Sequence, residues 1–158
     1  TSSKLREVLF NWIQFEIHNL KCLDLFAGTG SLGIEAISRG ANNTVFIESN
    51  KKNYQMLKNS IHELNLNDKS MVLFKDGLAW IKENNLSDFD LIFLDPPFNE
   101  NYEKKVLDIL KKKQNLKSSC KIYVEFSKFT EVEIPDSFTI SKEKTLGDVK
   151  ALLLNNDN

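Results

Sequence analysis

The sequence predicts an α/β protein with a mainly parallel sheet, helices on both faces and an antiparallel hairpin near the C-terminus. Short apolar segments alternate with segments of helical periodicity along most of the chain. Such alternation requires crossover connections between parallel strands. Two further strand-like segments near the end of the chain are separated only by a short turn, which is typical of a hairpin.

The first expected element is an amphipathic helix over residues 2–15. Ser2 or Ser3 can cap it, and its apolar residues recur at helical spacing: Leu5, Val8, Leu9, Trp12 and Ile13. Five buried strands are then expected at 21–26, 44–48, 71–74, 90–94 and 121–126, because these segments are short and rich in apolar residues. Helical spacing predicts helices between the strands at 31–39, 51–64, 78–84 and 102–113.

The expected hairpin consists of strands at 138–144 and 149–154, joined by a turn that contains Gly147 and Asp148. The polar residues 155–158 are expected to be a disordered tail. Five parallel strands followed by a hairpin are typical of the seven-stranded, Rossmann-like sheet of S-adenosylmethionine methyltransferases. A nicotinamide dehydrogenase would not be expected to end in this way.

Composition fits one globular domain that spans residues 1–158. The chain is 41% hydrophobic and 27% charged, and it has a net charge of −1. No apolar run approaches the roughly 20 residues that a membrane-spanning helix needs. Cys22 and Cys120 lie far apart, so we expect two free thiols in a cytoplasmic protein, with no disulfide framework and no metal site. The chain begins at Thr1 and not at Met, so we expect a segment upstream of it.

A glycine-rich segment follows the first expected strand. Gly28, Gly30 and Gly33 satisfy the pattern G-x-G-x-x-G, which also occurs in proteins that bind dinucleotides such as NAD. However, Asp24 lies toward the carboxyl end of the preceding strand, four residues before Gly28, and its carboxylate would repel a pyrophosphate. The same carboxylate suits the ammonium group of S-adenosylmethionine, and glycines at positions 28 and 30 allow the backbone to approach this cofactor closely.

Two further acidic residues follow expected strands. Glu48 ends the second strand, where a carboxylate can accept hydrogen bonds from both ribose hydroxyls of a nucleoside. Asp76 follows the third strand and could accept the adenine amino group, with Gly77 and Leu78 near the ring. The alternative is that Asp76 is only a helix cap.

The fourth expected strand runs directly into Asp95, Pro96, Pro97 and Phe98. Ligands of open α/β sheets bind beyond the carboxyl ends of the strands, so this tetrapeptide should lie beside the glycine segment. The carboxylate of Asp95 and the carbonyl of Pro96 could each accept one hydrogen of an exocyclic amine, which directs the nitrogen lone pair toward a methyl donor. Phe98 offers a face on which an extruded base can stack. A simple proline turn is the structural alternative.

These motifs together resemble the bacterial 16S rRNA guanine-N2 methyltransferases of the RsmD type. The resemblance covers nearly the whole chain, through TSSKLREVLFNWI, CLDLFAGTGSLGIEAISRGA, FIE, DPPF, IYVEFS and the closing hairpin. It implies that Asp24, Phe26, Gly28 and Gly30 hold the methionyl end of the cofactor S-adenosyl-L-methionine and that Glu48 holds its ribose. Asp76 and Gly77, placed after the third strand, complete the candidate cofactor residues. It also implies that Asp95, Pro96 and Phe98 serve the target guanine, and that residues 1–15, with Arg6, Glu7 and Asn11, close over the cofactor.

The implied substrate is 16S rRNA, within an assembled or assembling small ribosomal subunit. Three residues are candidate substrate contacts: Pro97, Arg6 and Lys104. Further basic residues are candidates for a rim that binds RNA: Lys4, Arg39, Lys105 and Lys111 to Lys113. We expect a monomer. Many relatives have Tyr where Phe98 stands, and they have a basic segment before the position of Thr1. Glu125 matches the family pattern, and the sequence leaves open whether it is catalytic or structural.

Two alternative functions remain at this point. One is a DNA adenine-N6 methyltransferase or another amino methyltransferase, because such enzymes also use DPPF. The segment REVLFNW argues against it. The other is a non-catalytic module that binds a nucleotide such as NAD. Calorimetry with each cofactor distinguishes this module from a methyltransferase.

Overall fold

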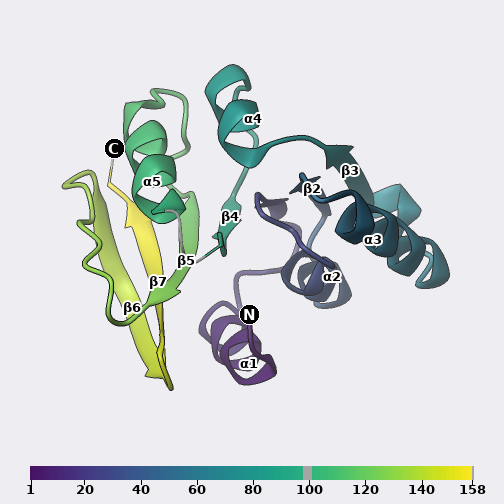
Figure 1. The fold of residues 1–158 in the computed structure, drawn as a ribbon, viewed down its shortest axis with the longest axis horizontal. Coiled ribbons are helices and arrows are strands. Elements are labelled where there is room, and N and C mark those ends of the chain that lie inside the picture. The colour runs from purple at the N-terminus through teal and green to yellow at the C-terminus, as the bar shows by residue number, and fades with distance from the viewer. Residues whose placement is uncertain (98–100, 158) are drawn as a thin grey trace.

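The computed structural model describes residues 1–97 and 101–157, and it contains a seven-stranded sheet in the order β3-β2-β1-β4-β5-β7-β6. The first five strands pair in parallel, whereas β7 is antiparallel to both β5 and β6. The prediction of a mainly parallel sheet with a C-terminal hairpin is therefore confirmed (Figure 1). The strands are β1 (Lys21–Asp24), β2 (Asn43–Glu48), β3 (Ser70–Phe74), β4 (Leu91–Leu94), β5 (Lys121–Ser127), β6 (Phe138–Leu146) and β7 (Val149–Asn156).

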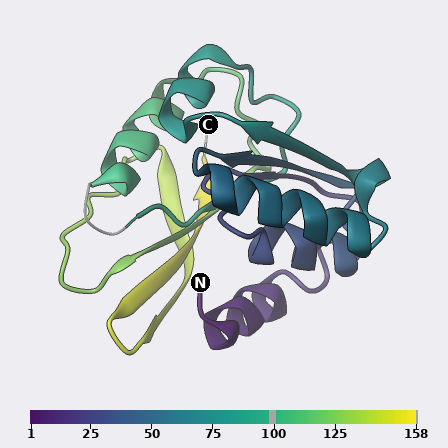
Figure 2. The same ribbon diagram turned by 45° about the vertical axis from the view of Figure 1, so that its right-hand side comes forward.

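Helices cover both faces of the sheet, as the sequence predicted (Figures 1 and 2). The helices are α1 (Ser3–Trp12), α2 (Ser31–Ser38), α3 (Lys51–Glu63), α4 (Gly77–Glu83) and α5 (Tyr102–Lys112), and a short 3₁₀ turn, Asn67–Lys69, precedes β3. Buried side chains of α1, α2 and α3 pack on one face, and those of α4 and α5 pack on the other. The sheet therefore lies between two layers of helices. Because β1, β2, β4 and β5 are parallel neighbours, their carboxyl ends lie next to one another at the same end of the sheet.

The alternation of side chains along β4 decides what lies on each face. Leu91 and Phe93 join the apolar cluster under α1 and α2, whereas Ile92 and Leu94 join the cluster under α4 and α5. Because successive side chains of a strand point to opposite faces, Asp95 continues on the α1 side.

The same alternation applies to the strands on either side of β4. In β1, Cys22 belongs to the cluster under α1 and α2, and Asp24 follows it two positions later. In β5, Tyr123 belongs to that cluster, and Glu125 follows it two positions later. Carboxylates at or near the carboxyl ends of three neighbouring strands therefore face the same layer.

Helix α1 fixes the N-terminus against this face. Ser2 caps the helix, because its Oγ accepts the N–H of Leu5 at 3.1 Å. Leu9 and Phe10 are fully buried, and the ring of Phe10 lies 6.1 Å from that of Phe93. The helix ends earlier than the expected residue 15, at Trp12, and the chain continues in turns that leave Phe15 91% exposed.

The expectation of a disordered tail was wrong for its first two residues. Asn155 and Asn156 belong to β7, whose pairing with β6 and β5 extends beyond the apolar run. The buried side chain of Asn156 donates hydrogen bonds to the carbonyls of Leu116 (3.2 Å) and Lys117 (2.8 Å). A polar residue can therefore end a buried strand when backbone carbonyls satisfy its amide. Asn158 lies outside the described residues.

Candidate active site

The glycine segment is tied to the end of β2 by a carboxylate. Glu48 is 8% exposed, its Oε1 accepts the N–H of Gly28 at 2.7 Å, and its Oε2 accepts the N–H of Asn50 at 2.7 Å. Glu48 is therefore not a solvated strand end. Each oxygen retains one lone pair for a further donor.

Glycine is required at several positions around this segment. Gly28 and Gly30 have φ values of +58° and +86°, which side-chain-bearing residues rarely adopt. Gly33 allows α2 to lie directly on β2, because a Cβ there would be 2.3 Å from Cε1 of Phe46. Gly77 similarly faces the strand end, and a Cβ on it would lie 3.0 Å from the carbonyl oxygen of Leu25. Backbone therefore lines much of this edge.

Asp24 is a buried carboxylate at the end of β1. Its side chain is 2% exposed, and its Oδ2 accepts the N–H of Gly33 at 3.1 Å. Burial raises the pKa of Asp24 to about 7, and the negative charges of Asp95 and Glu48 add to this effect. A cationic ligand at this position would favour the ionised form, as expected for a residue that receives an ammonium group.

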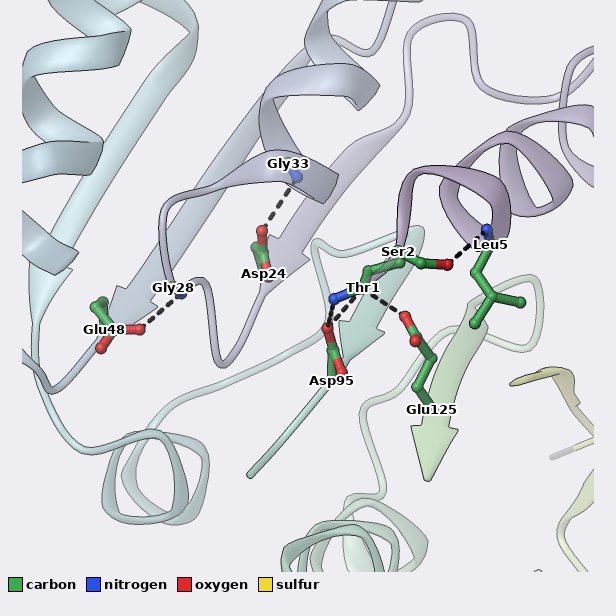
Figure 3. A network of polar contacts seen from close by, with 9 residues as sticks. All are labelled: Thr1, Ser2, Leu5, Asp24, Gly28, Gly33, Glu48, Asp95 and Glu125. Carbon is green, nitrogen blue, oxygen red and sulfur yellow. Dashed lines mark hydrogen bonds and ion pairs between the residues drawn. The ribbon is translucent and has the colours of Figure 1, made fainter. Parts of the chain in front are cut away.

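Asp95 lies beside two residues that are remote in the sequence (Figure 3). Its Oδ2 is 2.9 Å from the amino group of Thr1 and 2.5 Å from Oγ1 of Thr1. The same Oγ1 lies 2.5 Å from Oε2 of Glu125. One hydroxyl therefore bridges two carboxyl groups of adjacent strands: that of Asp95, directly after β4, and that of Glu125 within β5.

Glu125 is the most deeply buried member of this group, at 1% exposure. Burial and the charge of Asp95 raise its pKa, while the Thr1 hydroxyl, the Thr1 amino group and the Tyr123 hydroxyl act in the opposite direction. Tyr123, fully buried below it on β5, has a pKa raised by its own burial and by the charge of Glu125. The region around Glu125 thus disfavours an additional negative charge.

The remaining cofactor candidates have structural contacts of their own. Asp76 caps α4, because its Oδ2 accepts the N–H of Ala79 at 3.0 Å. Asp76 therefore caps a helix, and its contact with adenine remains a prediction. Phe26 is half-buried, with its ring 5.5 Å from that of Tyr102 at the start of α5.

The proline segment is described only in part. Pro96 is buried and Pro97 is exposed. Phe98, the expected stacking residue, lies outside the described residues. The structure therefore leaves its proposed role as a prediction.

The two basic candidates occupy different places. Arg6 lines an open cavity with Ser31, Ile34 and Glu35, between α1 and the start of α2. Lys104 instead lines a small cavity on the outer side of α5, with Glu133 and Pro135 among its neighbours. Arg6 thus lies near the glycine segment, whereas no hydrogen bond or ion pair among the described residues connects Lys104 to it.

Sequence reasoning did not identify Thr1 as a site residue and left Glu125 undecided. The alternation along β5 could have indicated that Glu125 shares a face with Tyr123. Nothing in the local pattern around Thr1 indicates that its side chain reaches the ends of β4 and β5, which are 94 and 124 residues away.

Other expectations concern features outside this site. Cys22 and Cys120 are both buried and free. Within residues 1–97 and 101–157, no group of His, Cys, Asp and Glu has the arrangement of a metal site. Among the helices of those same ranges, none has the length and apolarity to span a membrane.

Comparison with known proteins places this geometry in a family. Residues 1–155 match the family described as Conserved hypothetical protein 95. Ribosomal RNA small subunit methyltransferase D of Haemophilus influenzae is 38% identical over 158 residues, which cover 99% of this chain and 82% of that protein. The protein of the same name from Buchnera aphidicola subsp. Acyrthosiphon pisum is 37% identical over 153 residues, covering 97% of this chain and 80% of its own length.

Solved structures agree in fold. A putative methyltransferase from Escherichia coli has a TM-score of 0.91 at 28% identity and covers 99% of this chain and 88% of its own. A putative methylase from Haemophilus influenzae has a TM-score of 0.87 at 38% identity, covering 97% and 96%. The chain thus has the Rossmann-like methyltransferase fold, belongs to the Conserved hypothetical protein 95 family and is a relative of proteins named ribosomal RNA small subunit methyltransferase D.

Proposed function

We propose that this chain transfers a methyl group from S-adenosyl-L-methionine to the exocyclic N2 amine of a guanine in small-subunit ribosomal RNA. The observation that carries the proposal is the position of Asp95 at the end of β4, beside the buried carboxylate of Asp24 at the end of β1. One carboxylate suits a cationic cofactor, and the other suits an amine acceptor. The names of the relatives support ribosomal RNA as the substrate.

The described residues fit the cofactor. Asp24 would receive the ammonium group, and Glu48 has spare lone pairs for the ribose hydroxyls. Gly28 and Gly30 leave the backbone accessible between them, and Asp76, Gly77 and Phe26 would border the remaining part of the pocket. When bound, S-adenosylmethionine supplies an electrophilic sulfonium methyl group.

Asp95 would act on the acceptor amine. An exocyclic amine is a weak nucleophile because its lone pair is delocalised into the ring. Oδ2 of Asp95 is occupied by Thr1, whereas Oδ1 receives no hydrogen bond from the residues that the structure describes. Oδ1 can therefore accept one N–H of the amine, and the carbonyl of Pro96 can accept the other. Holding both hydrogens directs the lone pair toward the methyl group.

The substrate is expected to approach over the rim of this edge. Arg6 projects near the start of α2 and would contact phosphate, with Pro97 and Phe98 near the extruded base. The net charge of −1 gives little general attraction to RNA. We therefore propose that the substrate is an assembled or assembling small subunit, where protein contacts supplement those to phosphate.

The test is methyl transfer from labelled S-adenosylmethionine to small-subunit particles and naked 16S rRNA, both taken from cells that lack this protein. We expect one labelled guanine, identified as N2-methylguanine after digestion. Label on adenine N6 of DNA would instead favour the alternative amino methyltransferase. Calorimetry in which NAD binds more tightly than S-adenosylhomocysteine would favour the non-catalytic nucleotide-binding module.

A further inference from the structure

We propose that Glu125 is a neutral carboxylic acid that positions ionised Asp95 through the hydroxyl of Thr1. The inference rests on the proposed function, because its consequence concerns the residue assigned to the acceptor amine. The proton in question is that of the Glu125 carboxyl group, which lies where β4, β5 and the segment before α1 meet (Figure 3).

The first step is a count of protons. Oγ1 of Thr1 lies 2.5 Å from Oδ2 of Asp95 and 2.5 Å from Oε2 of Glu125. At such lengths each oxygen pair must share a proton, because two oxygens without one repel each other. A threonine hydroxyl carries a single proton. The second proton must therefore belong to one of the two carboxyl groups.

The second step assigns that proton to Glu125. Glu125 is 1% exposed, whereas the side chain of Asp95 is 19% exposed and its Oδ2 also accepts a hydrogen bond from the backbone nitrogen of Thr1 at 2.9 Å. Desolvation penalises the charged form most at the more buried group. The bridge therefore runs from the acid of Glu125 to Oγ1 of Thr1, and from the Thr1 hydroxyl to the carboxylate of Asp95.

The surroundings of Glu125 agree with this assignment. The groups that face it are Asp95 from the end of β4, Tyr123 from β5, and the Thr1 amino group, beside which Arg6 of α1 lies; its partner on β7 is Ala151, which has no charge. Asp95 is the one negative group among them, and ionisation of Glu125 would place a second negative charge next to it. The proton count depends on side-chain oxygens alone and does not require a charge on the amino group.

The neutral acid has a consequence for Asp95. The two hydrogen bonds, from Glu125 to Thr1 and from Thr1 to Asp95, fix the position of Oδ2 of Asp95. Oδ1 of Asp95 stays directed toward the amine that accepts the methyl group, and the carboxylate keeps its full charge. A second ionised carboxylate would remove the donor and repel Asp95. Glu125 is thus a positioning residue, because it acts through Thr1 and does not touch the reacting atoms.

Four single variants and one double variant test the proposal. Glu125→Gln keeps a neutral hydrogen-bond donor, and Glu125→Met keeps the length without a donor. We expect Glu125→Met to lower kcat at least tenfold at unchanged affinity for S-adenosylhomocysteine. With Glu125→Gln, the decrease in log kcat should be no more than half of that. Thr1→Val should behave as Glu125→Met does, and Thr1→Ser should restore activity. The double variant Thr1→Val/Glu125→Met should lose no more than either single variant, because both break one bridge.

The dependence of kcat on pH gives a second readout. Loss of the Glu125 proton at alkaline pH should reduce kcat of the wild type, and Glu125→Gln should lack this decline. A structural role alone would not change the pH profile. If Glu125→Gln were as inactive as Glu125→Met, ionised Glu125 would be the required form and the proposal would be overturned.

A third measurement is independent of activity. At neutral pH, the infrared difference spectrum between wild type and Glu125→Gln should contain the carbonyl stretch of a protonated carboxylic acid. Absence of this band, with both proteins folded, would refute the neutral acid whatever the substrate is. Presence of the band without any methyl transfer to RNA would instead refute the proposed function and leave the protonation state standing.

Discussion

Oδ2 of Asp24 accepts the backbone N–H of Gly33 at 3.1 Å, which fixes the end of β1 to the first turn of α2. A buried carboxylate needs hydrogen-bond donors, and this one satisfies only one of its lone pairs. The remaining acceptor capacity is buried with the side chain, at 2% exposure. Asp24 therefore lowers the stability of the ligand-free protein when it is ionised.

Replacement of Asp24 by Asn should stabilise the ligand-free protein at pH 8. Burial raises the pKa of Asp24 to about 7, so the folded wild type holds this proton more tightly than the unfolded chain does. Stability from this group is present at low pH and is lost as the pH rises from about 4 to about 7, by up to roughly 4 kcal/mol. Thermal unfolding of both proteins between pH 4 and pH 8 measures the difference. A wild type that gains stability relative to the variant across this window would contradict the prediction.

Cofactor binding should release protons near neutral pH. The ammonium group of the cofactor requires ionised Asp24, whose pKa in the free protein is about 7. Affinity for S-adenosylhomocysteine should therefore fall as the pH drops below 7, and the observed binding enthalpy should depend on the ionisation enthalpy of the buffer. Calorimetry in phosphate and in Tris at pH 6.5 measures the released protons. Asp24→Asn should bind weakly and show no such dependence.

The two left-handed glycines should differ in their tolerance of alanine. A Cβ at Gly30, where φ is +86°, would lie 2.2 Å from Cδ1 of Leu57, whereas a Cβ at Gly28, where φ is +58°, meets nothing within 4 Å. Gly28→Ala should cost about 1–2 kcal/mol from backbone strain alone. Gly30→Ala should cost more, because repacking of Leu57 adds about 1–3 kcal/mol. Urea unfolding of the two variants gives the comparison, and equal costs would show that the core around Leu57 adjusts freely.

Asp95→Asn should separate catalysis from cofactor binding. The variant keeps the size of the side chain but loses the charge next to the amine, so kcat should fall by about 10²- to 10³-fold. Affinity for S-adenosylhomocysteine should remain within about threefold, since the fold and Asp24 are intact. Steady-state methyl transfer and calorimetry on the same preparation measure both quantities. Near-normal kcat would mean that the segment from Asp95 to Pro97 is only a turn.

Truncation of Leu9 should affect both stability and the site. Leu9 is fully buried in the cluster under α1, so Leu9→Ala should lower the free energy of unfolding by about 2–5 kcal/mol. Because α1 carries Thr1 toward Asp95, we also expect a lower kcat at temperatures where the variant is folded. Glu7→Ala, at an exposed position of the same helix, is the control and should change stability by no more than about 0.5 kcal/mol. Comparable destabilisation by both variants would contradict the packing assigned to α1.

Much of the fold was readable from local pattern. Short apolar segments such as the one ending at Leu94 identified the strands, and the turn at Gly147 identified the hairpin. The observed bounds differ from the expected ones by a few residues at the ends of elements, because hydrogen bonding and not hydropathy ends a helix or strand. The polar end of β7 at Asn156 was missed for the same reason, since its amide is satisfied by carbonyls from another part of the chain.

The sequence by itself determined that Asp24, Glu48 and Asp95 end strands of a parallel sheet, because period and turn signals are local properties of the chain. Only the tertiary structure decided that Thr1 lies between Asp95 and Glu125, since that contact depends on the packing of α1 against β4 and β5. The ionisation of these groups was equally beyond the sequence. It is set by burial and by neighbouring charges, which exist only once the strands are assembled side by side.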